Sequence, residues 1–379
     1  MEVSPSLRLL VLGGDHMLGR AIQLTLPHRT RLEESLMDSM PAWYYLQLGL
    51  RDALPSLPSI REANRTGGYL YRHLMPLCTA LEPDVTLFNV ETSITTCLDH
   101  EDAPPKAIHY HTQPDNLFGL VDNLTPSPLV VSCANNHHSQ DTPRHFAGLG
   151  KNIEAAATLA NIQVGDVVVQ VFAVAACCAG ASPQMQATTD RSGVVLLPAL
   201  SSTAAVTAAL SILRAAIERA KEPADDGQVF RRHVAHELID AGLVDCIYGH
   251  WSHHLRGVEI YKGKCILYDA GDLVNDYESF TNPGEDCYLK IGAVFAVDVA
   301  TDSRRVVQIT VIPMYMEQLQ LVRLGSGSQQ WQPRSKCIES APSLEQVREF
   351  LTEMSLLDCQ ESLPWRRVWA VEGPALLYP

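Results

Sequence analysis

Four apolar, β-rich runs in this sequence each end in a short cluster of Asp, Glu, Asn or His. The runs cover residues 9–12, 85–88, 130–134 and 243–248, and the clusters that follow them cover 13–20, 89–92, 135–138 and 249–254. Helical stretches separate the runs, so the pattern predicts an α/β fold. In open α/β sheets, ligands bind outside the carboxyl ends of the strands. We therefore expect the four clusters to converge on one site.

The cluster at 249–254 is the most informative, because it places three imidazoles in one tight turn. His250, His253 and His254 directly follow a predicted strand. Neutral imidazole is the commonest protein ligand for transition metals, and a loop at a strand end can hold ligands in a fixed geometry. A polar surface turn that is rich in histidine explains this segment alone equally well.

Taken in order, the clusters form a set of motifs that is more specific than any one of them. The motifs are Gly14-Asp15-x-Met17-Leu18-Gly19-Arg20, Asn89-x-Glu91-Thr92, Ala134-Asn135-Asn136-His137 and Gly249-His250-x-Ser252-His253-His254. The set resembles the CapA family of bacterial capsule or poly-γ-glutamate synthesis proteins, over roughly residues 7–320. The fold of this family is similar to that of calcineurin-type metallophosphoesterases.

The resemblance implies a four-layer α-β-β-α sandwich of two mixed sheets. Residues 1–320 would form the family domain, and 321–379 a C-terminal extension of loop, helix and edge strand. The alternation of strands and helices alone does not distinguish this sandwich from a doubly wound single sheet. We expect helices at 144–160, 201–221, 229–241 and 343–356, a buried central strand at 164–176, hairpins pairing 257–261 with 265–269 and 293–300 with 305–315, and an edge strand within 369–378.

The same resemblance implies roles for individual residues. A two-metal hydrolase holds ions about 3.5–4 Å apart with oxygen and nitrogen ligands. The implied metal ligands are Asp15, Glu91 as the bridging acid, Asn136, His250 and His253, and the implied proton donor to the leaving group is His137. The implied substrate-binding residues are Arg20, Asn89, Asn135, His254 and Asp272. The cofactor would be a divalent ion such as Mn, Zn, Fe or Mg.

The sequence departs from the family pattern before its last cluster. Family members carry a strand that ends in His-Trp-Gly there, whereas here the predicted helix at 201–221 leads through 222–227 directly into the next predicted helix at 229–241. The missing histidine would have bound the second metal. We therefore expect at most one tightly held ion.

Each of these residues also has a simpler structural explanation. Asp15 could cap the helix that follows it, and Glu91 could stabilise a helix N-terminus. Asn135 and Asn136 could be turn residues that tolerate left-handed backbone geometry, and Asp272 could cap a loop. Four clusters in family order favour the functional interpretation of the set.

Composition narrows the classes of partner. The formal net charge is −14 and the Lys and Arg residues are scattered, which argues against nucleic acid because phosphate contacts need clustered cations. A bound cation reverses the local field, so an anionic polymer or small-molecule substrate remains compatible. The 10 cysteines show no Cys-x-x-Cys pattern. With no signal peptide and no apolar run of membrane-spanning length, we expect a cytoplasmic protein with reduced thiols.

Together these features predict a CapA-like protein of poly-γ-glutamate or capsule-type polymer metabolism. Its reaction would be metal-dependent hydrolysis or transfer at a γ-glutamyl amide or phosphoryl bond. The alternative is a non-catalytic accessory or binding protein, a degenerate metallohydrolase that retains the pocket. The missing strand favours the alternative, and the remaining site residues favour the enzyme.

Overall fold

We describe the fold from a computed structural model of the 379-residue chain. The structure describes residues 6–28, 41–50, 55–96, 110–135, 146–176, 181–197, 211–213, 230–250, 253–277, 291–323 and 369–371. The helix expected at 343–356 lies outside these residues, as does most of that expected at 201–221, of which 211–213 is helical. None of the described helices is long and apolar enough to cross a membrane.

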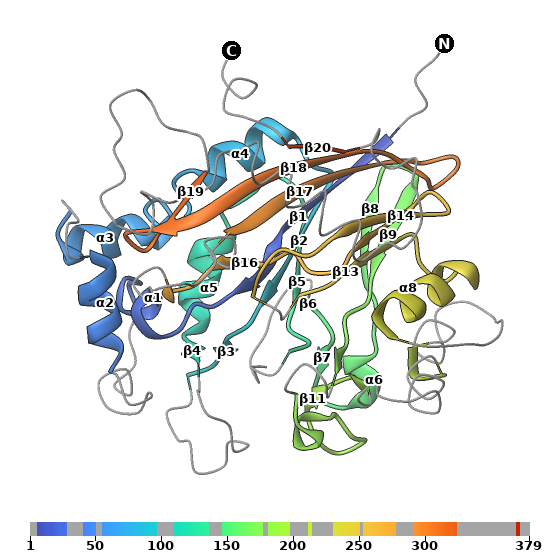
Figure 1. The fold of residues 1–379 in the computed structure, drawn as a ribbon. Coiled ribbons are helices and arrows are strands. Elements are labelled where there is room, and N and C mark those ends of the chain that lie inside the picture. The colour runs from blue at the N-terminus through green and yellow to red at the C-terminus, as the bar shows by residue number, and fades with distance from the viewer. Residues whose placement is uncertain are drawn as a thin grey trace.

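A mixed sheet of nine strands forms the core of the fold (Figure 1). Its order is β19-β18-β17-β1-β2-β5-β6, with β16 beside β1 and β20 beside β18. Strand β1 lies parallel to β2 and antiparallel to β17, so the fold is mixed α/β. The bounds are β1 (Ser6–His16), β2 (Val85–Val90), β5 (Leu129–Ser132), β6 (Phe146–Ala147), β16 (Asp272–Val274), β17 (Ile291–Ala300), β18 (Val306–Glu317), β19 (Gln320–Arg323) and β20 (Trp369–Val371).

Alternate side chains of β1 pack into two different hydrophobic cores. Leu10 packs with Leu74 and Leu117, which come from helices on one face of the sheet. Val11 points to the opposite face, where it shares a core with Leu267 of a second, smaller sheet. Burial of apolar area on both faces is the main force that holds the layers together. The helices of this part of the chain are α1 (Arg20–Leu24), α2 (Ala42–Leu50), α3 (Leu57–Ala63), the 3-10 helix η2 (Asn64–Thr66), α4 (Leu74–Leu81) and α5 (Pro114–Val121).

The smaller sheet has the order β13-β15-β14 and packs on the main sheet through this shared core. Its other side contacts helix α8, since Ile266 packs with Ala235 and Ile239. Figure 1 shows α8 on the right-hand side, beside β13. The bounds are α8 (Phe230–Asp240), β13 (Cys246–Tyr248), β14 (Val258–Tyr261) and β15 (Lys264–Leu267). Strand β13 leads directly into the histidine-rich loop.

Several expected elements are confirmed. Helix α8 corresponds to the helix expected at 229–241, and the two expected hairpins are β14 with β15 and β17 with β18. The tail contributes β20, which lies parallel to β18. Turn residues and alternating apolar positions define these elements locally, which is why the sequence pattern was sufficient.

The helix expected at 144–160 is wrong. This segment contains β6, then β7 (Leu149–Gly150) and only a short helix, α6 (Ile153–Ala156). Gly148 has a φ of +83°, outside the helical region, and a Cβ on Gly150 would lie 2.1 Å from the backbone nitrogen of Ala156. These two glycines interrupt the helix that the alanine-rich composition favours.

The buried central strand expected at 164–176 is also wrong. The segment instead belongs to a hairpin of β8 (Ala160–Val164) and β9 (Val167–Val171), which turns at Gly165 with a φ of +54°. Alternate residues of β9 face solvent, and Val168 is 49% exposed. A run of valines suits both kinds of strand, so composition could not separate them. The remaining elements are β3 (Ser93–Ile94), β4 (His111–Thr112), β10 (Ala175–Ala176), η4 (Pro183–Met185), β11 (Gly193–Val194) and β12 (Leu196–Leu197).

Candidate metal centre

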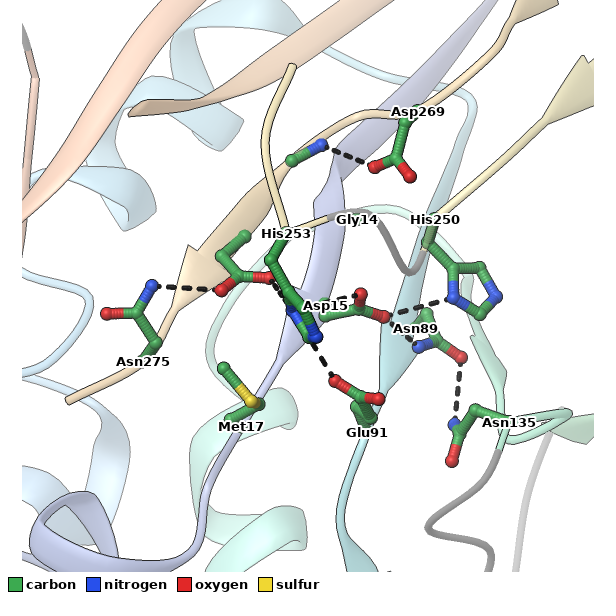
Figure 2. Close-up of polar contacts among 12 residues, drawn as sticks. Gly14, Asp15, Met17, Asn89, Glu91, Asn135, His250, His253, Asp269 and Asn275 are labelled. Carbon is green, nitrogen blue, oxygen red and sulfur yellow. Dashed lines mark hydrogen bonds and ion pairs between the residues drawn. The ribbon is translucent and has the colours of Figure 1, made fainter. Parts of the chain in front are cut away.

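Three neighbouring strands and one loop meet at the same edge of the main sheet (Figure 2). Asp15 on β1 is the register partner of Asn89 on β2 and of Asp272 on β16. The loop after β13 brings His250 and His253 to Asp15. The carboxyl ends of parallel strands share one edge of a sheet, so residues from distant parts of the chain gather here.

The turn that directs Asp15 into this site depends on two glycines. Gly13 has a φ of +62°, a backbone conformation that glycine adopts without strain. A Cβ on Gly14 would lie 2.4 Å from the carbonyl oxygen of Gly271, to which the Gly14 N–H donates over 2.6 Å. At this point the partner of β1 changes from β17 to β16.

Asp15, Glu91 and His253 form a group that could hold a metal ion, because one ligand atom of each lies within 4.8 Å of the others. Nδ1 of His253 lies 3.9 Å from Oδ2 of Asp15 and 3.9 Å from Oε2 of Glu91. Both carboxylates are buried, whereas the His253 side chain is 40% exposed and is the accessible member. Buried negative charge is costly unless it is paired or binds a metal. The donor set of two carboxylates and one imidazole therefore fits a divalent ion.

Asp272 orients His253. Nδ1 of His253 donates to Oδ1 of Asp272 over 2.9 Å, and Oδ2 of Asp272 accepts from the Asn275 amide over 3.1 Å. Burial lowers the pKa of His253, but the hydrogen bond and charge of Asp272, with the charges of Glu91 and Asp15, outweigh burial and raise the pKa to about 10. Without a metal, a proton on His253 therefore offsets part of the negative charge. A cation among these carboxylates would take over that function.

His250 contacts Oδ1 of Asp15, whereas His253 faces Oδ2. Nδ1 of His250 lies 3.0 Å from Oδ1. Burial alone would raise the pKa of Asp15, but the charge and hydrogen bond of His250, together with His253 and Asn89, hold that pKa below its usual value. His250 is not one of the three residues in the 4.8 Å group. Its role as a metal ligand stays a prediction.

Two residues expected to bind substrate are linked to Asp15 by hydrogen bonds. The Asn89 amide donates to Oδ1 of Asp15 over 2.6 Å, and the Asn135 amide donates to Oδ1 of Asn89 over 3.1 Å. Asn89 is 0% exposed and Asn135 is 5% exposed. Both amides make hydrogen bonds within the protein, and their expected role in substrate binding stays a prediction.

Arg20, also expected to bind substrate, is enclosed by the protein. Its guanidinium pairs with Asp276 and lies over the ring of Tyr45, with Cζ at 4.0 Å from the centroid. The rings of Tyr110 and Tyr277 lie at 5.2 and 5.3 Å. Arg20 is 5% exposed and so does not face solvent. Its ion pair with Asp276 joins α1 to the segment that follows β16.

The remaining predicted residues give less information. His254 is half-buried beside His253. Asn136 and His137 lie outside the described residues, so their expected roles as metal ligand and proton donor stay predictions.

Tyr248 is a site residue that the sequence reasoning missed. Its hydroxyl donates to the carbonyl oxygens of Gly13 and Gly14 over 2.7 and 3.0 Å, which ties the smaller sheet to the turn before Asp15. Side chains two residues apart on a strand point to the same side. The position of Tyr248 two residues before His250 was the available signal.

Asp269 was missed as well. It is buried, accepts the Gly271 N–H over 3.0 Å, and its charge adds to that of Asp15 in raising the pKa of His250 against the effect of burial. Its place just before Gly271-Asp272, at the end of a predicted strand, follows the same rule as the four clusters.

Known proteins support the resemblance that these clusters suggested. The profile of the bacterial capsule synthesis protein family PGA_cap matches residues 141–277. Two Mycobacterium tuberculosis proteins, from strains CDC 1551 and H37Rv and both named probable polyglutamine synthesis accessory protein, are 30% identical over 364 residues, which cover 87% of this chain and 90% of each relative. This chain belongs to the PGA_cap family. An uncharacterized protein of Sinorhizobium fredii strain NGR234 is 44% identical to this PGA_cap protein over 69 residues, 18% of this chain and 13% of that relative. The span matched by the PGA_cap profile contains His250, His253 and Asp272.

Proposed function

We propose that this PGA_cap protein binds one divalent metal ion through Asp15, Glu91 and His253 and acts in the metabolism of a poly-γ-glutamate or capsule-type polymer. The supporting observation is that three ligand atoms from three distant segments lie within 4.8 Å of one another. Mixed carboxylate and imidazole ligands suit Mn, Fe or Zn better than Mg, which prefers oxygen ligands and water.

The proposed reaction is hydrolysis or transfer at a γ-glutamyl amide or a phosphoryl bond. When bound, the ion supplies a Lewis acid that polarises a carbonyl or phosphoryl oxygen. Asp15 and Glu91 would hold the cation. Asp272 accepts the Nδ1 proton of His253 over 2.9 Å, which would fix the ring and leave Nε2 as the nitrogen that binds the cation. His250 keeps a proton on Nδ1, against Oδ1 of Asp15.

The proposed partner is an anionic polymer or small molecule. The chain carries a formal net charge of −14, and the site adds buried carboxylates, so the metal-free site repels an anion. A bound divalent cation reverses the field at that point. Binding of a glutamate polymer should therefore require prior metal loading.

A second candidate is a non-catalytic accessory protein that binds the metal and the polymer without turnover. The two mycobacterial relatives are named accessory proteins. In the part of the chain that the structure describes, there is a single group of three residues that could bind a metal, whereas a two-metal hydrolase clamps both the attacking and the leaving oxygens. Both observations are compatible with binding alone.

One experiment separates these candidates. Metal-free protein is loaded with Mn²⁺ and assayed for cleavage of bis-p-nitrophenyl phosphate, γ-glutamyl-p-nitroanilide and poly-γ-glutamate, and in parallel for polymer binding. The enzyme proposal predicts Mn²⁺-dependent turnover that Glu91→Gln abolishes. The control is His236→Ala, which should preserve turnover because His236 lies on α8 and pairs with Glu259. Mn²⁺ and polymer binding without turnover would support the accessory protein. Absence of Mn²⁺ binding would contradict both.

We also propose that the layers form the four-layer α-β-β-α sandwich of the calcineurin type. Support comes from helices on one face of the main sheet, the smaller sheet on the other face, and α8 on the far side of the smaller sheet. In this arrangement residues 1–320 form the family domain. Residues 321–379 would form the extension, and its described parts, 321–323 in β19 and 369–371 in β20, both pair with β18 of the main sheet.

A further inference from the structure

A chain of buried amides leads from the segment after β5 to the carboxylate of Asp15. The Asn135 amide donates both to the backbone oxygen of Val90, over 2.7 Å, and to Oδ1 of Asn89, over 3.1 Å. The Asn89 amide in turn donates to Oδ1 of Asp15 over 2.6 Å. Figure 2 shows the three side chains in this order, from Asn135 through Asn89 to Asp15. This series of hydrogen bonds runs from the segment after β5 to β2 and then to β1, and these three strands are neighbours in the main sheet.

The backbone oxygen of Val90 sets the direction of this chain. A carbonyl oxygen can only accept, so the NH₂ group of Asn135 must be the part that faces it. The same NH₂ group then meets the oxygen of Asn89, which leaves the NH₂ group of Asn89 pointing at Asp15. The orientation of an amide is assigned from such a network, and here one fixed acceptor assigns both amides. The carboxylate of Asp15 is an acceptor, as this direction requires.

The amide chain also determines which oxygen of Asp15 faces the metal group. Oδ1 receives the Asn89 amide at 2.6 Å and lies 3.0 Å from Nδ1 of His250. Oδ2 is the oxygen that faces His253, at 3.9 Å. The two oxygens are therefore divided, one held by protein donors and the other directed to His253 and Glu91.

We propose that Asn135 and Asn89 are positioning residues, which act in series to hold Asp15 with Oδ2 presented to the cation, and that neither contacts the substrate. This inference rests on the proposed metal-binding function. A substrate-binding role would need accessible surface, which the two buried amides lack. Residues that orient a metal ligand typically contribute about 10-fold to 100-fold in metal affinity.

A double-mutant cycle tests the serial arrangement, with Mn²⁺ alone as the probe. The dissociation constant is measured by calorimetry for the wild type, Asn89→Leu, Asn135→Leu and the double variant. Leucine has the same branched arrangement of side-chain heavy atoms as asparagine, although it is larger, and it donates no hydrogen bond. We expect each single variant to weaken Mn²⁺ binding about 10-fold, and the double variant also about 10-fold, because Asn135 acts only through Asn89. The electron paramagnetic resonance spectrum of bound Mn²⁺ should change alike in all three variants.

Controls separate positioning from packing. Asn64→Leu removes a buried amide that bonds Thr25 and Leu70, and it should leave Mn²⁺ affinity and the Mn²⁺ spectrum unchanged. Asn135→Ser serves if the leucine variant does not fold, which near-ultraviolet circular dichroism shows. Independent effects that multiply to about 100-fold in the double variant, or wild-type affinity in the single variants, would overturn the inference. Failure of the wild type to bind Mn²⁺ would overturn the proposed function itself.

Discussion

Nδ1 of His250 lies 3.0 Å from Oδ1 of Asp15, and this contact links the loop after β13 to the end of β1. This contact gives His250 and His253 different positions at the same carboxylate. His250 approaches Oδ1, whereas His253 faces Oδ2 and Glu91. The two histidines should therefore differ in their effect on metal binding.

We predict that His253→Ala weakens Mn²⁺ binding more than His250→Ala does. Loss of His250 removes a partner of Asp15 and should cost about 10-fold in affinity, as is typical for a residue that orients a ligand. Loss of His253 removes a member of the metal group, and the effect should be larger. Titration calorimetry on both variants gives the order, with His236→Ala as the control. Equal losses would mean that both histidines bind the ion.

Arg20→Gln should destabilise the fold. The change removes the charge that pairs with Asp276, and a buried carboxylate left without its partner costs about 3–5 kcal/mol. Urea denaturation of metal-free protein measures the change. The matched control is Arg65→Gln, which removes an exposed pair with Glu62 and should change the free energy of unfolding by no more than about 0.5 kcal/mol. Native stability in Arg20→Gln with loss of polymer binding would contradict this account and would support Arg20 as a substrate residue.

The site was predictable from the sequence only in part. The strand-end rule brought Asp15, Glu91 and His253 together, because the order of apolar runs and polar clusters is visible in the chain. The direction of each side chain is not visible there. Asn89 sits at a strand end like Asp15 yet its amide faces that carboxylate, and this depends on the register of β1 with β2. The burial of Arg20 likewise depends on contacts made only in the folded protein.

The fold, like the site, could be predicted from the sequence only where local pattern determines it. The hairpin of β17 with β18 depends on local alternation and a polar turn, so the sequence predicted it. The helix expected at 144–160 failed because Gly148 and Gly150 lie where neighbouring backbone comes close, and close approach is a property of tertiary structure.

Tyr248→Phe should lower the free energy of unfolding by about 1–3 kcal/mol. The hydroxyl donates to two backbone oxygens at the turn before Asp15, and its removal takes this donor from both acceptors. Tyr261→Phe is the control, since its hydroxyl bond to Asp240 is exposed, and its effect should be smaller. Equal effects in the two variants would show that the Tyr248 contacts do not hold the sheets together.

His16 should make the fold sensitive to acid. Its Nε2 donates to the backbone oxygen of Leu12 over 2.9 Å, the Tyr71 hydroxyl lies 3.1 Å from its Nδ1, and burial lowers its pKa to about 4. The folded state thus resists a proton that the unfolded state accepts near its ordinary pKa of about 6.5. This contribution to stability is complete above that pH and is lost as the pH falls towards about 4, with a loss of about 2 kcal/mol at pH 5.

The measurement for this prediction is urea denaturation at pH 7 and pH 5 for the wild type and His16→Gln. Glutamine retains polar groups but does not titrate. The drop in stability between the two pH values should be smaller in His16→Gln by about 2 kcal/mol. Identical drops would show that another group causes the acid sensitivity.

Metal stoichiometry tests the central claim most directly. Protein stripped with a chelator is equilibrated with Mn²⁺, Zn²⁺ or Fe²⁺, and bound metal per chain is measured by elemental analysis for the wild type and Glu91→Gln. Glutamine keeps the shape of the side chain and removes the charge. We predict one tightly bound ion per wild-type chain, and its loss in Glu91→Gln while the fold is retained. A wild type that binds no more metal than Glu91→Gln would contradict the metal centre.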